Sequence, residues 1–166
     1  DFKVETYLCV SGKIQDFYGL PKEKSKVIYV GSDLSEKLKG VSAEEVAEIK
    51  NSLGIKPGML VIGFVGRLIE WKGPRLLLDV YSGLVKEGFA TTIHLIIVGE
   101  GPMRGELENE IIRWGLTGRV SLVGQVEDVE VWYKVFDIFV HSSVAPEPFA
   151  TTVVEAAMAG FPVVAT

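Results

Sequence analysis

Two glutamates near the end of the chain, Glu147 and Glu155, are the residues whose type and spacing most readily suggest chemistry. Pro148 disfavours helical geometry at Glu147, so that residue is expected in a loop. The small and apolar run 153–159 predicts a short helix that stops at Gly160, with Glu155 in its first turn. Two carboxylates at one strand-to-helix crossing can accept hydrogen bonds from several hydroxyls, which are the groups that a ribose and a hexose present.

Each of these glutamates also has a simpler interpretation. Thr152 and Glu155 fit a capping box, in which the carboxylate turns back to a backbone amide and only fixes the helix start. Glu147 can equally be an exposed loop carboxylate. Thr151 and Thr152 favour a binding role, because their amides and hydroxyls at a helix amino end suit a phosphate. Both interpretations stay open at the level of the sequence.

Positive charges follow an earlier apolar run. The stretch after Gly66 holds Arg67, Lys72 and Arg75, and Pro74 indicates that a helix begins there. Three cations that repel one another beside a positive helix end store unfavourable electrostatic energy, which a pyrophosphate would relieve. The alternative is that all three cations extend into solvent.

The elements that position these residues follow from the alternation of short apolar runs with segments of helical periodicity. This pattern predicts an α/β fold with a doubly wound, mostly parallel sheet and helices on both faces. The expected strands are 7–10, 27–30, 60–65, 93–98, 120–123, 138–141 and 163–165. The expected helices cover 43–53, 77–85 and 103–114 besides the run 153–159, and the polar segment 31–40 is expected to be a linker or surface loop.

Ligands of such sheets bind at the carboxyl ends of the strands. The loops at those ends are 66–73, 99–102, 124–128 and 142–152, and every distinctive residue of the chain falls in one of them. The loop that contains Val126 can offer backbone groups to a nucleobase.

Length and composition exclude several classes of protein. The 166 residues fit one domain, 1–166. There are 17 basic and 22 acidic residues without a long block of one sign, so a nucleic-acid-binding surface is not expected. Cys9 is the only cysteine, so no disulfide forms within the chain, which suits the cytoplasm. The apolar runs are too short to span a membrane, and any membrane contact is expected to be peripheral, at the inner face.

Four segments together resemble the retaining glycosyltransferases of family 4, also called group 1, which have the two-domain GT-B architecture. The segments are GRLIEWKG, IIVGEGPMRGELE, VSLVGQV and SSVAPEPFATTVVEAAMAGFPVVAT. They occur in the family's order. The segment SSVAPEPF resembles the corresponding segment of sugar transferases of cell-surface polysaccharide or glycolipid assembly. The resemblance implies the donor-binding domain of an enzyme that transfers a sugar from a nucleotide-diphosphate sugar to an acceptor hydroxyl.

The resemblance also implies roles for single residues. Arg67 and Lys72 would hold the donor diphosphate, so that neither a metal nor another cofactor is needed. Glu155 would bind the ribose hydroxyls, and Glu147 would contact the transferred sugar near the reacting carbon as the catalytic residue. The implied donor-binding set is completed by Gly66, Val126, Ala150, Thr151 and Thr152.

Two departures from the family pattern keep alternatives open. Ala150 stands where the family usually has glycine, and the sequence stops at PVVAT without an amino-terminal acceptor domain. We therefore expect a fragment that binds nucleotide but is inactive alone, that receives its sugar or lipid-linked acceptor on a missing domain, and that self-associates through its cut sheet. The alternatives are a non-catalytic sugar-nucleotide-binding module and a sugar-nucleotide epimerase on a related fold.

Overall fold

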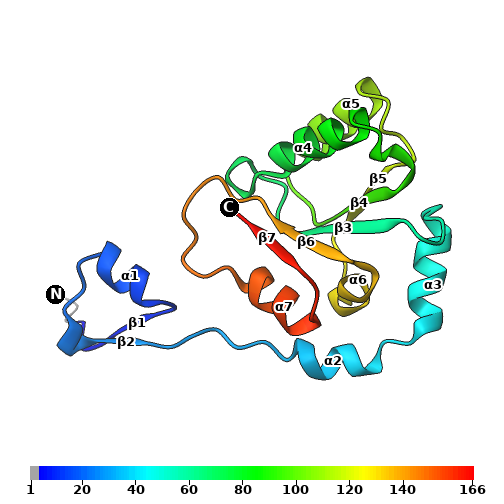
Figure 1. Cartoon of the computed structure of the whole chain (residues 1–166). Coiled ribbons are helices and arrows are strands. Elements are labelled where there is room, and N and C mark those ends of the chain that lie inside the picture. The colour runs from blue at the N-terminus through cyan, green and yellow to red at the C-terminus, as the bar shows by residue number, and fades with distance from the viewer. Residues whose placement is uncertain (1–3) are drawn as a thin grey trace.

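The computed structural model describes residues 4–166, whose strands form two separate sheets (Figure 1). The larger sheet has five strands in the order β5-β4-β3-β6-β7, and every neighbouring pair is parallel. Its strands are β3 (Leu60–Val65), β4 (Ile93–Val98), β5 (Val120–Gly124), β6 (Ile138–His141) and β7 (Val163–Ala165). Of the seven strands expected from the apolar runs, the five that form this sheet are confirmed.

Helices cover both faces of this sheet, as predicted. One face carries α4 (Pro74–Lys86) and α5 (Arg104–Arg113), and the other carries α2 (Leu34–Gly40), α3 (Ala43–Ser52), α6 (Val129–Val135) and α7 (Thr151–Ala159) (Figure 1). Successive strand residues point to opposite faces, so Val61 joins one apolar core and Ile62 the other. Gly63 lies at the middle of β3 because a side chain there would overlap the ring of Phe136.

The expectation of a linker or surface loop at 31–40 is wrong for most of that segment. Residues 34–40 form α2, and the side chains of Leu34 and Leu38 are only 2% and 6% exposed. They lie one helical turn apart on one face and pack into the core beside α6 and α7. The segment is therefore a structural helix of the sheet's cover.

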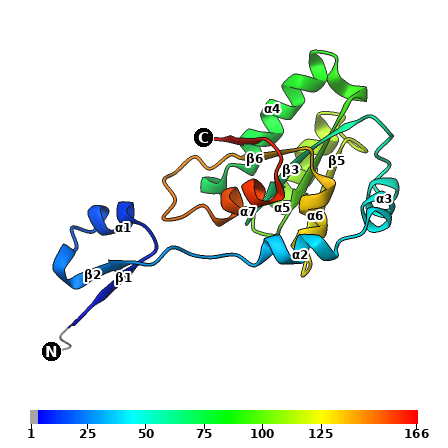
Figure 2. The same ribbon diagram turned by 60° about the horizontal axis from the view of Figure 1, so that its bottom comes forward.

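The amino-terminal strands do not join the large sheet. β1 (Tyr7–Cys9) and β2 (Ser25–Val27) pair with each other, and between them lie α1 (Gly12–Phe17) and a 3-10 turn, η1 (Lys22–Lys24). An extended segment leads from β2 to α2 and sets this amino-terminal unit beside the main body (Figure 2). The unit contacts the loop after β6, where Ser11 Oγ donates to the Pro148 carbonyl at 2.7 Å and the rings of Tyr29 and Phe149 lie 6.3 Å apart.

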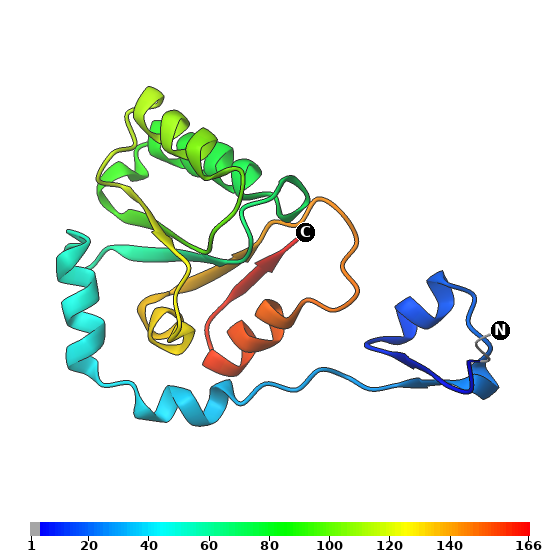
Figure 3. The same ribbon diagram turned by 180° about the vertical axis from the view of Figure 1, so that it is seen from behind.

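The strand order places a switch point at β3. From β3 the chain crosses to β4 on one side, and it later returns to β6 on the other side. The loops after β3 and β6 therefore diverge at the carboxyl edge of the sheet, where doubly wound folds hold their ligands. The loop after β6 arches from the sheet toward α1 (Figure 3). Within residues 4–166, no helix has the length and apolar character to cross a membrane.

Candidate functional site

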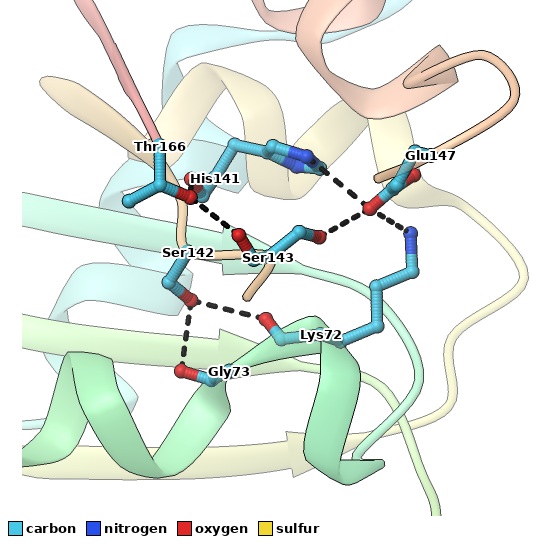
Figure 4. Close-up of polar contacts among 7 residues, drawn as sticks. All are labelled: Lys72, Gly73, His141, Ser142, Ser143, Glu147 and Thr166. Carbon is cyan, nitrogen blue, oxygen red and sulfur yellow. Dashed lines mark hydrogen bonds and ion pairs between the residues drawn. The ribbon is translucent and has the colours of Figure 1, made fainter. Parts of the chain in front are cut away.

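The loop after β3 is fixed in place by the end of β6. It contains a 3-10 turn, η2 (Glu70–Lys72), and then Gly73, whose φ of 65° lies in the left-handed region. A side chain at Gly73 would overlap the Ser142 carbonyl, so the close approach of the two loops requires glycine. Ser142 Oγ donates to the carbonyls of Lys72 at 3.1 Å and Gly73 at 2.9 Å (Figure 4). These contacts position Lys72 beside the loop that carries Glu147.

Three donors converge on one oxygen of Glu147 (Figure 4). Its Oε1 accepts from Lys72 Nζ at 2.7 Å and from Ser143 Oγ, and His141 Nε2 lies 3.2 Å away. The Glu147 side chain is 9% exposed and that of Lys72 is 16% exposed. Oε2 has no hydrogen-bond partner among residues 4–166, so it is the oxygen left for a ligand hydroxyl.

The charges of this network follow from burial and from the pairing. Burial works against the charge of Glu147, but the hydrogen bonds from Lys72 and Ser143 and the positive charge of Lys72 prevail and lower its pKa below the ordinary value. Burial lowers the pKa of His141, opposed by Glu147 and reinforced by Lys72. At neutral pH the network therefore holds a carboxylate, an ammonium and a neutral imidazole.

A cleft of about 540 Å³ lies at the carboxyl ends of β3 and β4. Arg67 and Glu155 border it, and its remaining walls come from Val65, Gly66, Val98, Gly99, Glu100, Gln125, Val126 and Val129. Within residues 4–166, no carboxylate lies within 4.0 Å of the Arg67 guanidinium. Trp71 connects this cleft to the Glu147 network, since Arg67 Cζ and Lys72 Nζ lie 6.0 Å and 4.6 Å from its ring centroid.

The structure decides between the two interpretations of Glu155. Its Oε2 accepts a hydrogen bond from the Tyr133 hydroxyl at 2.9 Å, and the start of α7 has no side-chain cap. The capping box with Thr152 is therefore not formed. α7 begins at Thr151, two residues before the expected start, so the placement of Glu155 in the first turn is wrong. Burial raises the pKa of Tyr133, and Glu155 raises it further, which keeps the phenol protonated as a donor.

The start of α7 lies beside Tyr133, whose hydroxyl is 3.5 Å from the Thr152 carbonyl, but it does not line the cleft. Ala150 precedes the helix with a φ of −82°, a value open to any residue, so no glycine is required there. Thr151 is exposed and Thr152 is partly buried. Six of the nine predicted site residues thus border the cleft or the Glu147 network, and these three stand at the amino end of α7.

The predicted cluster of three repelling cations is wrong. Arg75 lies on α4 and is engaged by α5, through Glu106 at 2.6 Å and Glu110 at 2.8 Å. Lys72 is paired with Glu147, so part of the expected repulsion is already relieved within the protein. Sequence reasoning also missed Ser143, Tyr133 and Trp71. Of these, Ser143 had a signal, because it lies four residues before Glu147 in a loop already singled out.

Comparison with known proteins assigns the family. A model of the family "Glycosyl transferases group 1" matches residues 60–166, which contain all five strands of the large sheet. The chain belongs to this family. It is 33% identical over 154 residues to an uncharacterized glycosyltransferase of Methanocaldococcus jannaschii, covering 92% of this chain and 38% of that protein. It is 33% identical over 131 residues to the lipopolysaccharide core biosynthesis mannosyltransferase LpsB of Rhizobium meliloti, covering 72% and 34%.

Solved structures agree with this assignment. HepE of Anabaena, crystallised with UDP and glucose, is 31% identical with a TM-score of 0.83, over 97% of this chain and 44% of that one. The carboxy-terminal domain of LpcC from Francisella tularensis has a TM-score of 0.63 over 81% of this chain and 70% of that one, and at 21% identity it shows the fold alone. The large sheet is therefore the Rossmann-like half of a GT-B glycosyltransferase. The chain spans 38% and 34% of the lengths of the two curated relatives named above.

Proposed function

We propose that this chain is the donor-binding half of a retaining glycosyltransferase that uses a nucleotide-diphosphate sugar. The observation that carries the proposal is the single cleft bordered both by Arg67, a cation without a carboxylate partner within residues 4–166, and by Glu155, a carboxylate that accepts a hydrogen bond from Tyr133. A diphosphate needs a cation such as Arg67, and ribose hydroxyls need an acceptor such as Glu155, so a nucleotide requires both groups in one cleft. HepE of Anabaena, which shares 31% identity, was crystallised with UDP-glucose, and this favours the same class of ligand here.

The donor is proposed to lie along the carboxyl edge of the sheet. Its nucleobase contacts the backbone near Val126, its ribose hydroxyls donate to Glu155, and its diphosphate lies between Arg67 and Lys72. The transferred sugar then reaches Glu147, whose free Oε2 accepts one of its hydroxyls. Arg67, which borders the cleft, and Lys72, which belongs to the Glu147 network, both lie over the ring of Trp71, and this supports one continuous site for both parts of the donor.

The proposed chemistry is electrostatic. As the bond between the anomeric carbon and the diphosphate breaks, its electron pair goes to the diphosphate, and the sugar becomes oxocarbenium-like. Arg67 and Lys72 stabilise the departing charge, and the Glu147 carboxylate lies near the electron-poor sugar. We assign this stabilisation to the two side chains and expect no metal to be needed. The acceptor hydroxyl attacks on the face that the diphosphate leaves and gives its proton to the departing diphosphate, which yields the glycoside with retention.

The acceptor is proposed to approach through a second hollow. This hollow of about 280 Å³ is bordered by Glu147 and by the amino-terminal unit, and its lining residues are Lys13, Ile14, Phe17, Tyr18, Pro146, Glu147 and Pro148. An acceptor seated there meets Glu147 directly. The similarity to LpsB, a lipopolysaccharide core biosynthesis mannosyltransferase, favours by analogy a role in cell-surface polysaccharide or glycolipid assembly.

The two alternatives from the sequence gain no support. Ala150 was the residue that favoured a non-catalytic module, and its φ of −82° removes that argument because no positive φ is needed. The epimerase alternative rested on a related fold, whereas the family match and the names of the relatives are those of transferases.

Titration calorimetry with UDP-glucose tests the proposed site. Replacing Arg67 by alanine removes a charge-assisted contact to the diphosphate and should weaken binding by about ten- to hundredfold. Arg119→Ala is the matched control. Arg119 directly precedes β5 and so lies at the amino ends of the strands, away from the proposed site at their carboxyl ends. Added EDTA should leave the affinity unchanged. Equal affinities for the two variants would refute the assignment of Arg67.

A further inference from the structure

The donors around Glu147 differ in what a bound diphosphate would do to them. Lys72, Ser143 and His141 all lie against the same oxygen, at distances of 2.7 Å for Lys72 Nζ and 3.2 Å for His141 Nε2. Lys72 is the only one that carries a positive charge at neutral pH, and it is also a proposed diphosphate ligand. The cation that balances Glu147 in the free protein is therefore shared with the donor once the donor binds.

Sharing Lys72 leaves Glu147 short of positive charge. The free network has one ammonium, one carboxylate and a neutral imidazole, so its charges cancel. A diphosphate brings two negative charges to Arg67 and Lys72, while the Glu147 side chain stays 9% exposed and water cannot fully compensate for it. His141, whose own side chain is also 9% exposed, is the neutral group in contact with that carboxylate that can gain a proton.

We propose that His141 is a positioning residue that takes up a proton when the donor diphosphate binds, and so gives Glu147 a second cationic partner. The proton comes from solvent, and no covalent bond changes. This inference rests on the proposed function, because it needs a diphosphate at Lys72. Its consequence is that donor binding holds the Glu147 carboxylate in place for the sugar through the His141 imidazolium.

The charged groups that act on His141 support this direction. They are Glu147, from the loop after β6, and Lys72, from η2. The side chains of Ser143 and Thr166 contact the same segment but carry no charge. Burial lowers the pKa of His141, Glu147 raises it, and Lys72 lowers it. A diphosphate cancels the effect of Lys72 and adds negative charge of its own, so the pKa of His141 rises on binding.

The test is calorimetric titration with UDP-glucose at pH 6.5 in buffers of different ionisation enthalpy. UDP-glucose is the suitable probe, because its diphosphate is esterified at both ends, whereas the terminal phosphate of UDP itself titrates near pH 6. Proton uptake makes the observed binding enthalpy depend on the buffer. We expect a net uptake, and an affinity that increases as the pH falls from 8 to 6, with about tenfold for each unit of rise in the pKa of His141 as the upper limit.

His141→Gln is the matched variant, because the glutamine amide still donates to Glu147 but does not titrate. We expect it to bind UDP-glucose without buffer-dependent enthalpy and with nearly constant affinity over this pH range. His94 is buried near the amino end of β4, whereas the site lies at the carboxyl ends of the strands. It is present in both proteins and serves as an internal control. If this variant does not fold, His141→Asn takes its place in the same titration, because its amide does not titrate either.

The outcomes separate the two proposals. UDP-glucose binding without proton uptake would overturn the role of His141 and leave the donor site intact. Uptake that persists in His141→Gln would also overturn it, because another group would then be the proton acceptor. No binding of UDP-glucose or of other nucleotide sugars would overturn the donor site and this inference with it.

Discussion

At the scale of residues, the site consists of pairs of charged or polar groups that come from distant parts of the chain. Lys72 meets Glu147 across 75 positions, and Tyr133 meets Glu155 across 22. The sequence indicated that Arg67, Lys72, Glu147 and Glu155 share one edge of a sheet, because each follows a recognisable strand. It did not predict the pairings, since these depend on which strands are neighbours and on helix starts that differ by one or two residues.

The two buried histidines give a prediction about acid stability. Burial lowers the pKa of His94 and of His141 in the folded protein, whereas in the unfolded chain both titrate near about 6.5. The unfolded state therefore binds more protons below that pH, and the free energy of unfolding should fall between pH 7.5 and pH 5.5. Glu147, whose folded pKa is lowered, adds a further loss only as the pH falls through that lowered value. Urea denaturation at the two pH values measures the first effect.

The variant His141→Gln separates the contributions. It should reduce the loss of stability on acidification but not abolish it, because His94 remains with its Nδ1 unpartnered within residues 4–166. A free energy of unfolding in the wild type that is the same at both pH values would contradict the buried, neutral state of both histidines.

At the scale of elements, the five strands were predictable and part of the cover was not. Strands such as β4, with all six residues buried, appear in the sequence as apolar runs, which in β4 only His94 interrupts. α2 was missed because its face toward the core consists of only Leu34 and Leu38, within a polar segment that contains Gly31 and Gly40. β1 was recognised as a strand, whereas the strand expected at 27–30 is wrong beyond Val27, because β2 covers Ser25–Val27. An apolar run also does not identify its pairing partner.

Gly73 gives a prediction about how elements position the site. Alanine at this position would be strained at a φ of 65° and would overlap the Ser142 carbonyl. We expect Gly73→Ala to lower the free energy of unfolding by more than about 1 kcal/mol and to weaken UDP-glucose binding, because Lys72 is displaced.

Gly83→Ala is the control, because Gly83 lies inside α4 with no atom within 4 Å of the added carbon. It should stabilise by about 0.5–1 kcal/mol. Equal effects on stability in the two variants would contradict the close loop contact.

At the scale of the whole molecule, the strand order brings the site together. β3 lies between β4 and β6, so the loops that carry Arg67, Lys72 and Glu147 open toward one edge of the sheet. The amino-terminal unit contacts the Glu147 loop through Ser11 and Tyr29, and it forms one wall of the proposed acceptor hollow. β7 is an edge strand with Val164 exposed, and self-association through that edge stays a prediction.

The most direct test of the donor site is a crystal structure of this protein with bound UDP-glucose. We predict the diphosphate within hydrogen-bonding distance of Arg67 and Lys72, the ribose hydroxyls on Glu155 and the glucose next to Glu147. A nucleotide bound elsewhere on the molecule, or in this cleft with Arg67 and Lys72 both turned away from its phosphates, would contradict the account.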